Sequence, residues 1–454
     1  MDSSDWSYKK NGDRKMNLKR NWKIMALISA VIIIVISIAA FMKFLSLKKS
    51  RVLTIGIYSG SWNVPSENTY KVINDAISKF EKNHPGVKIK YSSGILKEDF
   101  SEWISGQVLL GREPDVFMIL PEDFNVFSST GVLKNLDGLI KKDKDFNSSK
   151  YYKAAYEFGK YQGKQFALPY ESVPTLMFVN KTLLEKEHIS IPDNSWTWDD
   201  FYRICKEVTK DTDKDGIIDQ FGFYDYTWEN AVCSNGIKLF NDTGTESYFG
   251  DEKVEEAVSF VKKLNSLNEG YQVTSKVFDM GKVAFRPLSF SEYRTYLPYP
   301  WRIKKYSNFE WDCIKLPSGP NGNNVSQLST LLMGISSRTK HEQLSWEFLK
   351  QLTYDEETQK NMFEYSQGVS VIKSVIESKK TIEEINKNMP SESSLNIKIL
   401  DNIMESAAVT PKFKKYESVM IKADSEINKI INGEENLDTT LLILQREINN
   451  MLTN

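Results

Sequence analysis

A polar joint between two strand-like runs constrains this chain more than any other feature of its sequence. The first run, Gln165 to Tyr170, contains Pro169, whose ring removes a backbone donor and so ends a strand or confines it to a sheet edge. The second run, Thr175 to Val179, follows a few residues later. The joint carries an aromatic ring, Tyr170, and a carboxylate, Glu171, where a core strand would carry only apolar groups. The pattern predicts a crossing between two lobes, with the joint at the floor of a cleft.

Strands and helices alternate in the region that follows residue 50. Apolar runs predict strands at Val52 to Ile57, Val87 to Tyr91 and Pro114 to Leu120. Helical spacing separates these runs over Thr69 to Asn83 and Asp99 to Leu110. The β-α-β-α-β order predicts an α/β fold whose ligand sites lie at the carboxyl ends of the strands. A chain of 454 residues is expected to form about two domains.

Two later stretches predict a helix and a strand from a few residues each. Thr197 is placed to cap a helix that begins at Trp198 and runs to about Lys210, with Asp200 in its first turn. The run from Leu328 to Ile335 predicts a strand.

Composition and motifs exclude several classes of function. The formal net charge of -1 gives no basic surface for nucleic acid. The three cysteines, Cys205, Cys233 and Cys313, are odd in number and widely spaced, so they predict neither a disulfide framework nor a CxxC motif. The sequence contains no HExxH, GxSxG, Walker or strand-following GxGxxG motif, and we therefore predict a protein that is not an enzyme.

One enzymatic alternative stays open. A glycosidase needs two carboxyl groups at a defined separation, which is a spatial quantity that the sequence does not give. Glu171 paired with Asp115 or Glu292 is the nominated set.

The N-terminal region predicts a membrane anchor. Residues 24-42 contain no charge and are long enough as a helix to cross a bilayer core. The basic residues of 1-23 favour a cytoplasmic tail, which places the linker 43-50 and everything after it outside. A cleaved signal peptide, with a small-residue site at Ile38 and Ala40, is the alternative.

An acidic loop at 211-222 predicts a structural calcium site. Asp211, Asp213, Asp215 and Asp219 occupy positions 1, 3, 5 and 9 of an EF-hand-like loop, Gly216 occupies the turn position, and Ile217 offers its backbone carbonyl at position 7. Gly222 stands at position 12, where an EF-hand has a bidentate Glu. An acidic, solvated turn without metal is the alternative.

Aromatic rings near predicted strand ends suggest a surface for sugar. Flat rings contact the C-H faces of sugars, and polar neighbours satisfy the hydroxyls. The rings are Trp62, Tyr170, Trp228, Phe290 and Tyr293, and the polar neighbours are Glu171, Arg286 and Ser289. For each ring taken singly, core packing is the alternative.

Seven stretches, in order, make the chain resemble the family 1 extracellular solute-binding proteins of ABC transporters, the maltose-binding-like group. The stretches are FEKNHPGVKIKY at 80-91, PDVFMI at 114-119, GKQFALPYESVPTLMFVNKTLL at 163-184, IPDNSWTWDDF at 191-201, GKVAF at 281-285, KLPSGPNG at 315-322 and HEQLSWEFLKQLT at 341-353. The resemblance implies a two-lobe fold with hinge crossings near 171-175, 327-333 and 368-375. It also implies a sugar bound between the lobes, hinge closure and delivery to permease subunits.

Carried onto this chain, the resemblance implies ligand contacts and lobe boundaries. The implied ligand residues are Trp62, Tyr170, Glu171, Trp228, and Ser289 or Phe290, with Phe413 and Tyr416 as weaker nominees. The calcium loop also occurs in some members. We assign 51-171 with 333-371 to the first lobe and 172-332 with 372-454 to the second.

The sequence departs from the family at its anchor. Members usually carry a lipoprotein signal, whereas this chain has an apolar segment and no cysteine beside it. We therefore expect a monomeric, membrane-anchored sugar-binding protein of an ABC importer, exposed outside the cytoplasm. A receptor that presents sugar to a membrane sensor kinase is the alternative.

Overall fold

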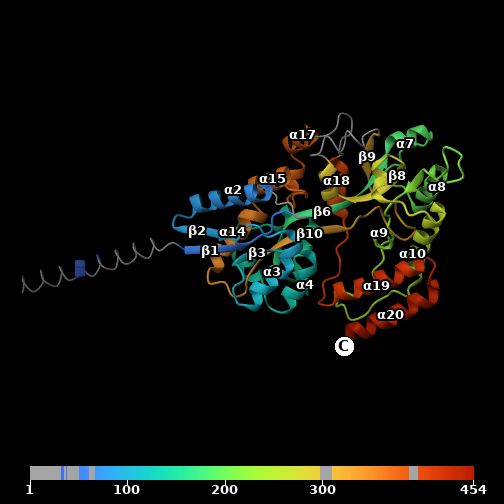
Figure 1. The fold of residues 1–454 in the computed structure, drawn as a ribbon. Helices are drawn as coiled ribbons and strands as arrows, with labels where there is room; N and C mark the ends of the chain where they lie inside the picture. Colours follow the sequence, from blue (N-terminus) through green and yellow to red (C-terminus); the bar gives the residue numbers. More distant parts are fainter. Residues whose placement is uncertain are drawn as a thin grey trace, which may run out of the picture. The chain divides into compact units, whose positions relative to one another are not determined.

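The computed structural model describes residues 32-34, 37, 51-60, 67-296, 309-387 and 397-453 (Figure 1). Trp62, and the predicted anchor 24-42 except for residues 32-34 and 37, lie outside the described residues. Within the described part of the chain, no helix combines the length and the apolar composition that a membrane span requires. The chain divides into two compact units, residues 1-52 with 81-89 and residues 53-80 with 90-454.

The described strands and helices alternate over most of the chain. The strands are β1 (Arg51–Gly56), β2 (Val87–Tyr91), β3 (Val116–Ile119), β4 (Lys160–Tyr161), β5 (Lys164–Gln165), β6 (Ala167–Asn180), β7 (Phe221–Phe223), β8 (Val283–Ser289), β9 (Trp311–Ile314) and β10 (Leu328–Ile335). The helices up to residue 265 are α2 (Glu67–Asn83), α3 (Lys97–Leu109), α4 (Pro121–Ser129), α5 (Asp137–Lys142), α6 (Lys153–Phe158), α7 (Lys181–Lys186), α8 (Trp198–Val208), α9 (Trp228–Ser234) and α10 (Glu252–Asn265). The later helices are α11 (Ser275–Asp279), α12 (Phe290–Tyr296), α14 (Glu342–Thr353), α15 (Glu356–Tyr365), α16 (Lys373–Ile376), α17 (Lys379–Lys387), α18 (Ile397–Ser406), α19 (Tyr416–Ile431) and α20 (Leu437–Thr453).

Hydrogen bonds and an ion pair connect the described residues of the smaller unit. The backbone N–H of Arg51 donates to the carbonyl oxygen of Gly86 over 2.8 Å. Glu81 accepts from the backbone N–H of Ile89 over 2.9 Å and pairs with the ammonium group of Lys88.

One long strand organises the larger unit. The order β1-β3-β10-β6-β8-β7 places β6 at the centre, and β9 also pairs with β6. The first half of β6 pairs antiparallel with β10, from Ala167 to Pro174, and the second half pairs with β8 and β9, from Thr175 to Asn180. We call the elements around β1, β3 and β10 the first lobe and those around β7, β8 and β9 the second lobe. β6 therefore belongs to both lobes.

The sequence predicted two runs broken at a joint, and this detail was wrong. Pro169 does not end the strand, because it lies opposite Leu332, where the pairing register with β10 shifts. Pro174 lies opposite Leu328, the first residue of β10. Both prolines thus fall where a missing N–H costs little, at an irregularity and at the end of a partner strand.

Local signals elsewhere were confirmed. α8 begins at Trp198, with a capping box in which Thr197 and Asp200 exchange side-chain and backbone hydrogen bonds. β10 spans the predicted residues Leu328–Ile335. The α/β class is confirmed by the order of the elements and by the sheet.

The core of the second lobe is rich in aromatic rings. Trp198 stacks on Phe260 with ring centroids 4.4 Å apart, and Phe201 meets Phe285 edge to face. The C-terminal helices α19 and α20, red in Figure 1, pack against α10 in this lobe.

Three chain segments meet where the lobes join. The N–H of Thr175 on β6 donates to the carbonyl oxygen of Gln327, just before β10. The N–H of Ala408 donates to the carbonyl oxygen of Ser326, and Ala408 forms a parallel bridge with Gln327. The first two predicted crossings therefore coincide with β6 and with the start of β10.

The third predicted crossing, 368-375, lies against the first one and stays a prediction. The backbones of Val369 and Ser172 exchange hydrogen bonds of 2.7 and 3.0 Å, so this segment pairs with the first-lobe half of β6. Further along the chain, α18 still packs on α6 of the first lobe, where the hydroxyl of Tyr152 donates to Asp401 over 2.6 Å. The lobe boundaries remain a prediction, and these contacts favour a boundary near residue 408 over one at 371.

Candidate functional site

Glu171 lies on the strand that both lobes share. It pairs with Leu331 of β10, and its Oε1 accepts a hydrogen bond from the hydroxyl of Ser366 over 3.0 Å. A Cβ on Gly368 would lie 2.2 Å from Cγ and Oε1 of Glu171, so this glycine makes room for the carboxylate. The half-buried Glu171 is therefore fixed by backbone and side-chain contacts.

Positive charges from both lobes act on the carboxylate of Glu171. Burial raises the pKa of this carboxyl group, while the Ser366 hydroxyl, the Gly368 N–H and the positive charges of Arg294 and Lys97 act against the rise. Such a carboxylate can accept hydrogen bonds from ligand hydroxyls at the boundary of the two lobes.

Two tyrosines lie close to Glu171. Tyr170 is buried, with 3% of its surface exposed. Successive side chains of a strand point to opposite faces, so Tyr170 faces away from the side to which Glu171 points. Tyr58, which follows β1, packs edge to face on Phe100 with ring centroids 5.5 Å apart. Burial, and then the charge of Glu171, raise the pKa of the Tyr58 hydroxyl far above its ordinary value. The sequence offered a signal for Tyr58, an aromatic turn directly after a strand, but our nominee from that turn was Trp62.

Acidic residues follow β3 at the start of α4. Asp123 accepts a hydrogen bond from the hydroxyl of Ser101 over 2.5 Å, and burial raises the pKa of its carboxyl group. Glu417 of α19 lies within electrostatic range of Glu122 and Asp123. Burial raises the pKa of Glu417, the charge of Lys412 lowers it, and the two α4 carboxylates raise it further. Sequence reasoning missed this cluster, because acids are common and these lie almost 300 residues apart.

Lys412 adds a positive charge where the chain enters the second lobe. Its ammonium nitrogen lies 4.1 Å from the ring centroid of Phe158 and 6.0 Å from that of Phe124, both in the first lobe. It donates to the hydroxyl of Thr410 over 3.1 Å. Burial lowers the pKa of Lys412 to about 8, against the opposing effect of Glu417. The ammonium group of Lys412 thus interacts with the carboxylate of Glu417 in the second lobe and with aromatic rings of the first lobe.

Several predicted ligand residues lie in the core of the protein. Trp228 is 1% exposed and its Nε1–H donates to Asp424 over 2.9 Å. Phe413 packs edge to face on Phe240, with centroids 5.0 Å apart, and the half-buried Tyr416 packs on both rings. These rings pack against neighbours, as the core alternative expected.

Phe290, Arg286 and Ser289 are held by contacts within and between the lobes. Phe290 is fully buried beside Phe363, with ring centroids 6.3 Å apart. The guanidinium of Arg286 lies 3.6 Å from Asp225 and 3.5 Å from Glu292. The hydroxyl of Ser289 donates to Glu292 over 2.7 Å at the start of α12.

The nominated glycosidase acids are engaged in structural contacts. Asp115 accepts from the backbone N–H of Thr54 over 2.9 Å and from the hydroxyl of Thr339 over 2.5 Å. Glu292 bonds Ser289, as described. The carboxylate of Asp115 thus bonds one residue in β1 and one after β10, and that of Glu292 bonds the residue before α12.

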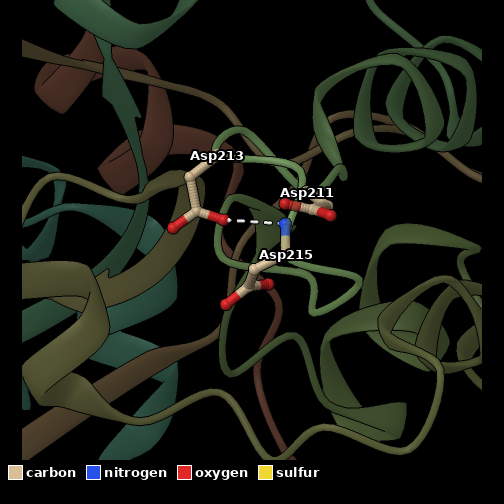
Figure 2. A group of neighbouring side chains, drawn as sticks. All are labelled: Asp211, Asp213 and Asp215. Atoms are coloured by element: carbon tan, nitrogen blue, oxygen red, sulfur yellow. Dashed lines mark hydrogen bonds between the residues drawn. The ribbon is translucent and has the colours of Figure 1, made fainter.

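The acidic loop brings three of its carboxylates together. Asp211, Asp213 and Asp215 each offer an oxygen within 4.8 Å of the others, and Figure 2 shows the N–H of Asp215 bonded to Asp213. In Asp213, the lowering of the pKa by that N–H is outweighed by desolvation and by the charges of its acidic neighbours. Three hard oxygen donors at this spacing fit a calcium ion.

The other predicted calcium ligands are placed differently. Asp219 accepts from the ammonium group of Lys282 over 2.9 Å and from the N–H of Thr212 over 2.8 Å, and these bonds lower the pKa of Asp219 to about 2. Ile217 is 48% exposed and its N–H donates to Asp215. A pocket of about 170 Å³ adjoins Asp219 and Lys282.

Two α/β lobes that share a central strand define a two-lobe, periplasmic-binding-protein-like fold. The model of the bacterial extracellular solute-binding proteins matches residues 64-359. The chain therefore belongs to that family, which confirms the resemblance inferred from its sequence.

Known proteins show the same likeness. The arabinooligosaccharide-binding protein of Bacillus subtilis is 28% identical over 148 residues, which are 31% of this chain and 32% of that protein. The match thus spans about a third of that relative's length.

Solved structures match most of the chain. An ABC substrate-binding protein of Listeria monocytogenes in complex with cycloalternan covers 89% of this chain and 99% of its own, with 21% identity and a TM-score of 0.68. The cyclic α-maltosyl-1,6-maltose binding protein of Arthrobacter globiformis covers 89% and 99%, with 16% identity and a TM-score of 0.73. The sugar-binding protein MalE of Xanthomonas citri covers 88% and 97%, with 15% identity and a TM-score of 0.72. At these identities the likeness shows the fold.

Proposed function

We propose that this protein binds an oligosaccharide between its two lobes and serves an ABC importer. The observation that carries the proposal is the position of Glu171, a carboxylate fixed on the strand that belongs to both lobes. Family membership supports a binding role, and the ligands after which the relatives are named are oligosaccharides or cyclic saccharides.

The proposed mechanism is closure around the ligand. Carboxylates of Glu171, Glu122 and Glu417 accept hydrogen bonds from sugar hydroxyls, and Tyr58 and Trp62 offer rings to the C-H faces of the sugar. Because these residues come from both lobes, the ligand makes its full set of contacts when the lobes approach. It therefore shifts the population toward the closed form, and no covalent chemistry is required.

Calorimetry on the full chain tests this function. We expect at least one of arabinotriose, maltotriose, mannotriose and cycloalternan to bind and to compact the protein in solution scattering. Glu171→Gln should weaken that binding about ten-fold or more, since a hydrogen bond to a charged group contributes about 1.5 to 3 kcal/mol. Glu364→Gln, at an exposed site on α15, is the matched control. Failure of all four sugars to bind or to compact the protein contradicts the proposal, and sustained release of reducing sugar would favour the glycosidase alternative.

Anchoring and delivery belong to the same proposal. The apolar residues 24-42 support a single-pass anchor, with the remainder of the chain outside the cytoplasm and delivery to membrane-spanning permease subunits. A receptor for a sensor kinase is the second candidate, because a lipid-attachment cysteine is absent from this segment. Purification of the full chain from membranes distinguishes the two, since permease subunits or a kinase should accompany it.

Calcium in the acidic loop is a further part of the proposal. Asp211, Asp213 and Asp215 would hold the ion, which would neutralise three adjacent carboxylates and stiffen the loop. We expect chelation to lower the melting temperature and Asp213→Ala to abolish that response. Asp242→Ala, an exposed acid of the same lobe, should leave it intact. A melting curve indifferent to calcium and chelator contradicts the assignment.

A further inference from the structure

Arg294 of α12 reaches from the second lobe to the end of a first-lobe helix. Its Nη1–H group donates to the carbonyl oxygen of Phe363 over 2.6 Å and also to that of Ser366. These carbonyls lie at the C-terminus of α15, where backbone acceptors lack partners within the helix. A cation is favoured at this negative end of the helix dipole.

The position of Arg294 is set by packing and by the start of its own helix. The guanidinium lies 5.6 Å from the ring centroid of Phe290 and 5.3 Å from that of Phe363, two buried rings that stack between the lobes. Ser289 and Glu292 exchange side-chain and backbone hydrogen bonds in a capping box at the first turn of α12. Helix, rings and guanidinium therefore form one fixed unit.

The same contacts lead to the candidate ligand site. Ser366, whose carbonyl accepts from Arg294, donates its hydroxyl to Glu171 over 3.0 Å and accepts from the N–H of Gly368 over 3.2 Å. On the other side, Ser289 lies opposite Thr175 of β6. The connection from α12 to α15 thus spans the part of β6 between Glu171 and Thr175, where the strand passes from one lobe to the other.

We propose that Arg294 is a latch: it fastens α12 of the second lobe to the C-terminal end of α15 in the first, and so holds Ser366 where it orients Glu171. This inference rests on the proposed closing motion. It makes Arg294 a positioning residue, which acts on the ligand site through Ser366. Opening of the lobes must break its bonds to the two carbonyls, so the latch favours the closed form before any ligand arrives.

Distance measurements on the full chain in detergent, without sugar, test the latch. Spin labels at Lys141→Cys on α5 and Lys206→Cys on α8 report on the two lobes. Cys233 is partly exposed and is replaced by Ser so that it takes no label, whereas Cys205 and Cys313 are buried and can remain. Double electron–electron resonance should show a larger population of long distances between the two labels for Arg294→Ala than for the wild type. Arg294→Lys should show a smaller increase, because an ammonium group keeps the charge but not the planar stacking.

Two control variants separate the latch from general effects. Arg203→Ala removes an arginine of the second-lobe surface that pairs with Asp200 in its own helix, and it should leave the distances unchanged. Ser366→Ala removes the hydroxyl that bonds Glu171 but keeps the carbonyl that accepts from Arg294, so it should also retain the wild-type distances.

Unchanged distances in both Arg294 variants overturn the latch. If Arg294→Ala does not fold, the distances in Arg294→Lys decide, and a wild-type distribution again overturns it. Because the measurement uses no ligand, its result is independent of whether any oligosaccharide of the panel binds.

Discussion

Replacement of Lys412 by Met should change how the stability of the protein depends on pH. The ammonium group lies against the rings of Phe158 and Phe124, and burial lowers its pKa from 10.5 to about 8. The folded protein therefore binds fewer protons than the unfolded chain between these two values. Stability must rise with pH across this window, because the cost of the buried charge is present below pH 8 and disappears above the unfolded pKa.

The magnitude follows from the shift in the pKa of Lys412. A difference of 10.5 − 8 = 2.5 pH units corresponds to about 3 kcal/mol as an upper figure, at about 1.36 kcal/mol for each unit. Of this, about 2 kcal/mol should be relieved between pH 7 and pH 9.5. Lys412→Met lacks the titrating group, so its stability relative to the wild type should fall by that amount over the same interval.

Urea unfolding at the two pH values measures this difference. Lys414→Met, at an exposed site two residues away, provides the control and should show no comparable change. The comparison concerns the change with pH, so it is insensitive to packing that Met gains or loses. A free-energy difference between Lys412→Met and wild type that is equal at both pH values would refute the reasoning.

Three further substitutions test local contacts. Gly368→Ala would place a Cβ 2.2 Å from the Glu171 side chain and should cost about 1 to 3 kcal/mol in thermal or urea unfolding; a variant as stable as wild type would show that the carboxylate has room to move. Trp228→Phe removes the 2.9 Å bond to Asp424 and should cost about 1 to 3 kcal/mol, and an unchanged unfolding midpoint would mean that this bond contributes nothing. Thr197→Ala removes the capping box of α8 and should cost about 1 kcal/mol, with Thr197→Ser restoring most of it; equal losses in both would count against the cap.

Elements with local signals could be predicted from the sequence. The cap at Thr197 and the apolar run Leu328–Ile335 each contain within a few residues the chemistry that defines the element. The continuity of β6 could not be predicted in this way. Whether Pro169 interrupts a strand depends on the partner opposite it, and the register shift in β10 that accommodates it is a property of the pairing.

The candidate site likewise contains residues that local sequence can nominate and residues that only the fold brings together. Glu171 was nominated because a carboxylate in a short joint between two apolar strand runs is unusual on its own. For Trp228 and Phe413 the ligand contact stays a prediction, since a ring near a strand end has the same sequence pattern whether it faces a ligand or the core. Lys412 and Glu417 become candidates once the fold brings their segment beside α4.

The join between the lobes explains why contacts beside β6 should contribute to closure. β6 is continuous, and on it Ser172 is secured by the Thr330 hydroxyl at 3.0 Å and by the backbone of Val369, while Thr175 pairs with β8. A bend between the lobes is therefore expected near Val173 and Pro174, which pair with Ser329 and Leu328 at the start of β10. The start of β10 pairs with β6 up to Pro174, and the backbone of Ala408 bonds Ser326, just before β10. Arg294 and Lys412 are charged groups that contact the first lobe beside this strand, and we expect them to contribute to the free-energy difference between open and closed forms.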